Sequence, residues 1–231
     1  CRLCKRASCA YPTVCKNLNT DHGPLLRIYE EARQVPGIKH CFIGSGIRYD
    51  LCLSDTGNKE VDKTNRRYLE TVIRHHVSGR FKVAPEHCSP TVLGLMRKPA
   101  FGLFQQLKSI FDEINRKHRL NEQIIPYFIS SHPGCRPEDM AELAVATKAL
   151  DFKLEQVQDF TPTPMTVATE AWYTGYHPYT LEPVFSAKTP REKLAQRQFF
   201  FWYKPEFRRQ ITQALQRIGK KDLIGRLFGK L

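Results

Sequence analysis

The sequence predicts an α/β fold with about four parallel strands, which form an open sheet or part of a barrel. Apolar runs alternate with segments of helical period in four successive units, and most of these runs end at Gly, Pro or Ser. Parallel neighbours cannot be joined by a tight hairpin, so the intervening helices serve as right-handed crossovers. Four strands are too few to close a barrel. We therefore expect a partial (β/α) barrel, completed by residues outside this chain, and a basic C-terminal tail.

The first two units lie in the N-terminal half of the chain. A helix begins at Pro24, where apolar residues recur at helical spacing, and it ends before the Pro36–Gly37 pair. The first strand is expected at Ile38–Ile47, because a short apolar run there ends in glycines. A second helix at Thr64–His76 leads into a second strand at Phe81–Pro85.

The next two units follow the same order. Helices are expected at Pro90–Met96 and Phe101–His118, before a bounded apolar run that predicts a strand at Gln123–Ile129. Proline and two acidic residues open a helix that should run from Pro137 to Leu150, since the helix dipole favours acidic side chains in the first turn. Leu154–Phe160 reads as the fourth strand.

Charge divides the chain into residues 1–185 and a basic, aromatic-rich extension of residues 186–231. The formal net charge is +13, and the segment Lys188–Leu231 holds 12 basic and 3 acidic residues. One interpretation is a nucleic-acid-binding module, because the aromatic run Phe199–Tyr203 is followed by basic residues. Five consecutive aromatic residues more often anchor a tail onto its own domain, so we do not favour this alternative.

Polar loops follow all four predicted strands. They occupy residues 44–50, 85–88, 130–135 and 161–166. In parallel α/β folds, ligands gather at the carboxyl ends of strands, so the repeated placement predicts a functional face. Arg48 can bind a carboxylate or phosphate through two parallel hydrogen bonds, and the Glu86–His87 pair can exchange protons. The competing interpretation is a set of ordinary turns with structural histidines.

Four cysteines crowd the N-terminal loop of residues 1–22. Cys1, Cys4, Cys9 and Cys15 have the spacing C-x2-C-x4-C-x5-C, which is close enough for four thiolates to share a zinc ion or an iron–sulfur cluster. Disulfides or free thiols are the alternatives. The spacing differs from the C-x3-C-x2-C triplet that leaves one iron open for S-adenosylmethionine, and no such triplet occurs in the chain.

Two further features bear on the cellular location. No apolar run approaches the roughly 20 residues that span a bilayer, so we expect no membrane insertion. The remaining four cysteines are scattered through apolar segments, which is typical of small core residues in a reducing compartment. We therefore expect a cytoplasmic protein, whose true N-terminus lies upstream because the first residue is not Met.

Several blocks, in order along the chain, resemble YgiQ-type radical S-adenosylmethionine proteins. The resemblance covers essentially the whole chain and rests on these blocks: CAYPTVCKNLNTDH, FIGSGIRYDL, VSGRFKVAPEHCSPTVLGLM, YFISSHPGC, QDFTPTPMTVATEAWYTG, EKLAQRQFFFWYKPEF and ALQRIGKKDLIGR. It implies a partial barrel of six β/α units, of which this chain holds the last four. The segment that carries the cluster triplet would then lie upstream of Cys1.

The resemblance also implies the chemistry. Reductive cleavage of S-adenosylmethionine at a [4Fe-4S] cluster would give a 5′-deoxyadenosyl radical, which abstracts hydrogen from an unknown substrate, with electrons from a flavodoxin-like protein. This chain alone would be inactive, because the cluster ligands are not in it. Carried over by position, the residues lining the cofactor or substrate cavity would be Ser45, Arg48, Glu86, His87, Ser131, His132, Thr161 and Thr163.

Overall fold

The computed structural model describes residues 4–155 and 157–229, which divide into two compact units. The first unit comprises residues 4–84 and 97–126, and the second comprises residues 85–96 and 127–229 without 156. The chain therefore crosses between the units more than once. The boundary predicted near residue 185 concerns a different division of the chain and stays a prediction.

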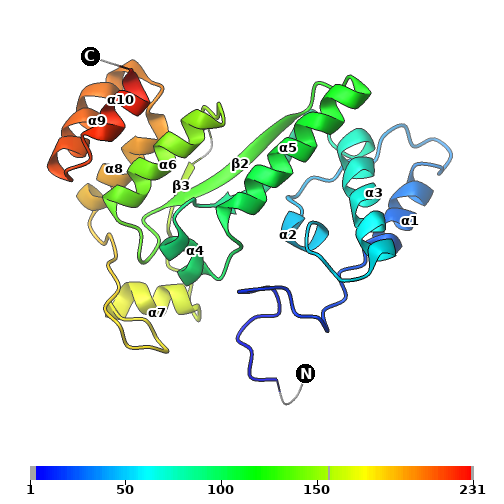
Figure 1. The fold of residues 1–231 in the computed structure, drawn as a ribbon, viewed down its shortest axis with the longest axis horizontal. Coiled ribbons are helices and arrows are strands. Elements are labelled where there is room, and N and C mark those ends of the chain that lie inside the picture. Colours follow the sequence, from blue (N-terminus) through cyan, green and yellow to red (C-terminus); the bar gives the residue numbers. More distant parts are fainter. Residues whose placement is uncertain (1–3, 156, 230–231) are drawn as a thin grey trace. The chain divides into compact units, whose positions relative to one another are not determined.

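Helices supply the core of the first unit, in which α3 packs against both α1 and α5 (Figure 1). Leu69 and Ile73 of α3, and Phe104 and Phe111 of α5, are fully buried. The side chain of Asn58 accepts hydrogen bonds from the first turn of α3 and so fixes where that helix begins. The helices of this unit are α1 (Gly23–Ala32), α2 (Tyr49–Cys52), α3 (Lys59–His75) and α5 (Phe101–His118).

Three strands form one parallel sheet in the order β1-β2-β3. They are β1 (Arg80–Glu86), β2 (Gln123–Ser130) and β3 (Val157–Asp159). The register of β2 and β3 pairs Phe128 with Val157 and Ser130 with Asp159. The α/β class, the strand order and the parallel direction predicted from the sequence are therefore confirmed for these three strands.

The first predicted strand, Ile38–Ile47, is wrong. Residues 38–46 have no regular secondary structure; the Ile38 amide donates to the Val35 carbonyl at 3.1 Å and the Ile43 amide to the His76 carbonyl at 2.9 Å. Ile38 and Phe42 are each 48% exposed. A strand needs a neighbour to satisfy its backbone groups, and the apolar run has none among the residues described here. Within the described residues the sheet is therefore open, with three strands in place of about four.

Helices cover the second unit, where α6 (Pro137–Ala149) packs against α8 (Pro190–Arg197), the 3-10 turn η1 (Gln198–Phe201) and α10 (Asp222–Phe228). Helices α6, α8 and α10 are labelled in Figure 1. The aromatic run lies at the centre of this packing. Phe199 and Phe200 are buried, the indole nitrogen of Trp202 donates to Thr147 Oγ1 at 3.1 Å, and the Tyr203 hydroxyl donates to the Leu154 carbonyl at 2.8 Å. The basic C-terminal segment is thus helical and anchored onto its own unit. No helix in the described parts of the chain is both long and apolar enough to cross a membrane.

The bounds of the second unit's helices follow from their prolines and caps. Proline occupies the first turn of α6, α8 and α9, where its missing amide costs no hydrogen bond. The helices are α4 (Pro90–Met96), α6 (Pro137–Ala149), α7 (Val167–Thr174), α8 (Pro190–Arg197), the 3-10 turn η1 (Gln198–Phe201), α9 (Pro205–Arg217) and α10 (Asp222–Phe228).

Candidate ligand-binding loops at the strand ends

Strand β1 ends on a non-glycine residue in the left-handed region, since Glu86 has φ of 66°. In the loop after β1, the next residue, His87, is fully buried. Its Nδ1 accepts hydrogen bonds from the amides of Cys88 and Ser89, both at 3.0 Å, and its Nε2 lies 3.5 Å from Cys135 Sγ. Because burial lowers the pKa of His87 to about 4, the ring is neutral near pH 7. His87 therefore holds this loop in place in its neutral form.

The loop after β2 begins with a residue in the same left-handed region, because Ser131 has φ of 61°. Gln196 of α8 holds the loop: its Oε1 accepts from the Ser131 amide at 2.8 Å, and its Nε2 donates to the Cys135 carbonyl at 2.7 Å. The Ser131 hydroxyl is buried and has no hydrogen-bond partner in the described structure. A buried hydroxyl without a partner is costly, and left-handed non-glycine residues concentrate at ligand sites.

His132 follows in the same loop and is also buried. Its Nδ1 lies 2.9 Å from the Pro133 carbonyl, which can only accept, so Nδ1 carries the proton and Nε2 presents a lone pair. The ring meets Phe160 edge-on, with 5.1 Å between centroids. Burial lowers the pKa of His132, which keeps the ring neutral at pH 7. Its available role is therefore that of a hydrogen-bond acceptor.

A carboxylate joins the loops after β1 and β2. Asp139, in the first turn of α6, accepts from Ser89 Oγ at 2.6 Å through one oxygen and from the Arg136 amide at 2.8 Å through the other. Together with the His87–Cys135 contact, these bonds make the two loops one framework. Such a framework fixes side-chain positions, which is what a binding site requires.

The loop after β3 is more open. Thr161 and Thr163 are exposed, and Met165, with φ of 65°, is fully exposed. At the end of β3, Asp159 accepts a short hydrogen bond from the Ser130 hydroxyl and lies 3.5 Å from Arg197 of α8. The predicted residues Glu86, His87, Ser131 and His132 thus share one framework, and Thr161 and Thr163 follow the strand next to it.

The predicted residues Ser45 and Arg48 belong to the first unit. Ser45 is exposed. Arg48 binds Asp50 through two parallel hydrogen bonds, from Nε at 2.8 Å and from Nη2 at 2.6 Å. The Asp50 side chain is 7% exposed, so the guanidinium neutralises a nearly buried carboxylate. The bidentate geometry predicted for Arg48 is therefore used within the chain itself.

The three N-terminal cysteines that the structure describes, Cys4, Cys9 and Cys15, form no metal-binding group. Cys4 and Cys9 are exposed and Cys15 is half-buried, and the Cys15 amide donates to the Cys9 carbonyl at 2.7 Å. Among the residues that the structure describes, no three His, Cys, Asp or Glu side chains are placed to hold a metal ion. Cys1 lies outside the described residues, so the four-cysteine centre stays a prediction.

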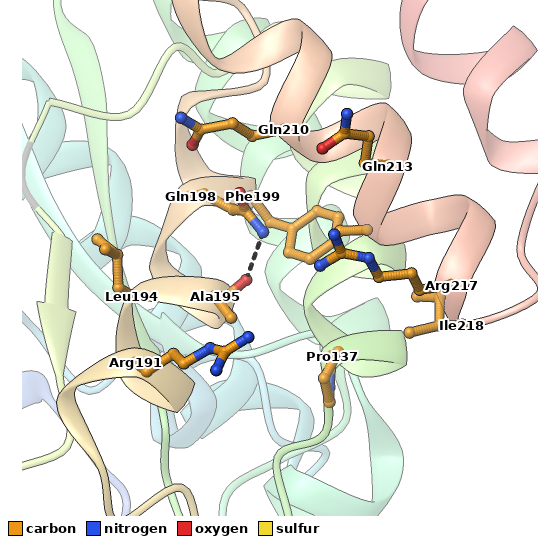
Figure 2. Close-up of a pocket in the computed structure, with 11 residues that line it drawn as sticks. Pro137, Arg191, Leu194, Ala195, Gln198, Phe199, Gln210, Gln213, Arg217 and Ile218 are labelled. Atoms are coloured by element: carbon orange, nitrogen blue, oxygen red, sulfur yellow. Dashed lines mark hydrogen bonds between the residues drawn. The ribbon is translucent and has the colours of Figure 1, made fainter.

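A separate groove of about 370 Å³ lies between the C-terminal helices of the second unit (Figure 2). Arg191 of α8 and Arg217 of α9 project toward it from opposite walls, and neither side chain forms an ion pair in the described structure. The Gln198 amide is engaged, since it donates to the Ala195 carbonyl at 2.8 Å. The groove is a feature of these helices and not of the strand-end loops.

The chain is closely similar to known bacterial proteins. A UPF0313 protein of Bacteroides thetaiotaomicron is 65% identical over 230 residues, which cover 100% of this chain and 37% of that protein. The chain belongs to the UPF0313 family. A UPF0313 protein of Porphyromonas gingivalis is 57% identical over 230 residues, which are 100% of the chain and 36% of that protein.

The UPF0313 protein YgiQ of Escherichia coli K12 is 38% identical over 229 residues, covering 97% of the chain and 30% of that protein. The resemblance found in the sequence is therefore confirmed at the level of the family. The chain spans 30% to 37% of the length of these UPF0313 relatives. The family model described as a domain of unknown function, DUF3362, matches residues 155–230.

Two residues of the framework, Gln196 and Asp139, were not predicted as site residues. Gln196 lies 65 residues from Ser131 in sequence, and no local pattern connects them. The sequence indicates Asp139 only as a helix-start residue, because acidic residues are common in first turns for electrostatic reasons. Both residues contact parts of the chain that are distant in sequence, and neither hydrophobic periodicity nor motif spacing predicts such contacts.

Proposed function

We propose that the protein containing this chain is a radical S-adenosylmethionine enzyme, and that the loops after β1, β2 and β3 form part of its cofactor or substrate site. The observation that carries the proposal is the pair of left-handed residues, Glu86 and Ser131, at the carboxyl ends of neighbouring strands, beside the unpartnered hydroxyl of Ser131. Three segments of the blocks that resemble the YgiQ type lie at the strand ends: PEHCSP at β1, SSHPGC at β2 and DFTPTPMT at β3. In parallel sheets this edge is where ligands bind.

The residues described here do not fit the iron–sulfur cluster. They contain no group of three metal-binding side chains, and the whole sequence lacks the C-x3-C-x2-C triplet. The cluster would therefore take its ligands from residues outside this chain. In the same proposal, the open sheet is the part of a barrel that residues outside this chain complete.

The strand-end loops do fit a polar organic ligand such as S-adenosylmethionine. When bound and reductively cleaved, this cofactor supplies a radical that abstracts hydrogen. The chain's own groups would bind and orient the ligand. The Ser131 hydroxyl would gain a partner for its unsatisfied donor and acceptor, and Thr161 and Thr163 are exposed at the next strand end, where the Thr161 hydroxyl donates to the Asp159 carbonyl at 3.5 Å. His132 offers a neutral acceptor. His87 positions the loop without touching the ligand, because its ring nitrogens are engaged.

Two further parts of the proposal concern partners and location. We place the enzyme in the cytoplasm, with a flavodoxin-like electron donor, in line with the resemblance; the substrate is not identified.

The nucleic-acid alternative loses its main support, because Phe199 and Phe200 are buried and Trp202 and Tyr203 form hydrogen bonds within their own unit. Stacking on nucleic-acid bases requires exposed aromatic faces.

Anaerobic assay of S-adenosylmethionine cleavage tests the proposal. A protein of the relatives' length that contains this chain, mixed with reductant, should form 5′-deoxyadenosine over many turnovers, and the 231-residue chain should form none above a control without protein. Ser131→Ala in the longer protein should slow this formation, while a matched exposed substitution, Ser109→Ala in α5, should leave it unchanged. Equal rates for both variants would contradict the role given to the strand-end loop.

A further inference from the structure

The first unit contains a cavity that is lined by basic residues and by no acidic residue. Its volume is about 440 Å³. Five of its nine lining residues are arginine, lysine or histidine: Arg33, Lys39, His40, Arg74 and His75. They come from the segment after α1 and from the last turn of α3, so both sides of the cavity carry positive or protonatable groups. Cavities of this size hold small molecules.

The cations of this cavity have no counter-charge within the described chain. The side chains of Arg33, Lys39 and Arg74 take part in no recorded ion pair or hydrogen bond. Elsewhere in the same unit the pattern differs, since Arg67 binds Glu30 at 2.7 Å and Lys117 binds Glu70 at 3.0 Å. Like charges gathered around one hollow repel one another, and an anion bound there would relieve that repulsion.

The neighbouring histidine reports the same positive field. The pKa of His75 is lowered, first by partial burial and then by the charges of Arg33 and Arg74, with smaller effects from His76 and His118. A negative charge placed in the cavity would act on His75 in the opposite direction. The pKa of His75 can therefore be used to detect anion binding in the cavity.

An apolar face adjoins the cations. The rings of His40 and Phe42 are stacked, with 5.2 Å between centroids and an angle of 10° between planes. Phe42 and Ile38 also line the cavity and are each 48% exposed. Flat, accessible ring surfaces beside arginine and lysine are suited to a ligand that has both a planar ring and charged groups.

Helix dipoles explain only part of this arrangement. Arg33 follows the C-terminus of α1, and Arg74 and His75 lie in the last turn of α3, where basic side chains are stabilised by about 0.3–1 kcal/mol. Lys39 and His40 lie in a segment without regular structure, so no helix end accounts for them. A dipole also gives no reason for placing all five groups around one cavity.

We propose that this cavity binds a small ligand bearing a diphosphate and a planar ring, such as a nucleoside diphosphate. Arginine and lysine would hold the phosphate oxygens, the guanidinium groups through paired hydrogen bonds, and the ring would pack on Phe42 and His40. The inference concerns the first unit and does not depend on the radical chemistry proposed for the strand-end loops.

Isothermal titration calorimetry on the 231-residue chain tests the proposal with ADP, pyrophosphate and adenosine as probes. Pyrophosphate should bind, ADP should bind more tightly, and adenosine should not bind measurably. Arg74→Gln and Lys39→Gln should each weaken ADP binding about tenfold or more. The control variants Arg27→Gln and Lys63→Gln remove exposed charges of the same unit outside the cavity and should leave binding unchanged.

A second readout separates site binding from general charge attraction. Proton NMR titration should show the pKa of His75 rising when pyrophosphate is added to saturation, and circular dichroism should show unchanged folding of each variant. Absence of ADP and pyrophosphate binding would overturn the proposal, as would equal losses in the control variants. Tighter binding of single-stranded RNA than of ADP, with the same dependence on Arg74 and Lys39, would overturn the small-ligand assignment.

Discussion

Protonation of His87 should couple the stability of the chain to pH. In the folded state burial lowers the pKa of His87 to about 4, whereas an unfolded chain has a histidine pKa near 6.5. Below about pH 6.5 the unfolded state binds a proton that the folded state does not bind, so the free energy of unfolding falls as the pH falls. With these two pKa values, the free energy of unfolding falls by about 2 kcal/mol between pH 7 and pH 5 and by about 3 kcal/mol at pH 4 and below.

Urea denaturation at a series of pH values measures this loss. His87→Asn keeps an acceptor near the position of Nδ1 and removes the titrating ring, so its free energy of unfolding should be lower at pH 7 but should change less toward pH 5. His177→Asn removes a half-buried histidine of the same unit and serves as the matched control. If the wild type and His87→Asn lose the same free energy between pH 7 and pH 5, the buried neutral state assigned to His87 is wrong.

Three further outcomes follow from the contacts. Gln196→Leu leaves the Ser131 amide and the Cys135 carbonyl buried without partners and should cost on the order of 3 kcal/mol in urea denaturation, whereas the exposed Gln213→Leu should cost under about 0.5 kcal/mol. Arg48→Gln leaves the nearly buried Asp50 carboxylate without its ion-pair partner and should lower the free energy of unfolding by about 1–3 kcal/mol. Elemental analysis after anaerobic purification should find zinc or iron that a variant with serine at the four N-terminal cysteines lacks; unchanged metal content would contradict the predicted centre.

Local signals in the sequence located most of the elements. Pro90 and Pro137 mark the first residues of α4 and α6, and the bounded apolar run ending at Ser130 marks β2, because each signal acts within a few residues of where it lies. Ile38–Ile47 carries a similar apolar run and forms no strand. A strand depends on a neighbour, and the sequence of the run itself does not say whether that neighbour is present.

The sequence predicts where the strand-end loops lie along the chain, but not the contacts within them. Polar residues after successive strands pointed to the segments that contain His87 and Ser131. The hydrogen bond from the Ser131 amide to Gln196 depends on α8, which lies about 65 residues away along the chain. The aromatic run at Phe199 and Phe200 was likewise ambiguous, because only the packing of α6, α8 and η1 decides between a buried anchor and an exposed stacking surface.

Hydrogen exchange on a protein of the relatives' length, with and without S-adenosylmethionine under anaerobic conditions, tests whether the loops after β2 and β3 contact the cofactor or a substrate bound with it. Peptides covering residues 130–136 and 160–166 should exchange more slowly when the cofactor is present, and the helical surface of α9 should show no change. Protection confined to regions outside residues 85–89, 130–136 and 160–166 would contradict the proposed contact.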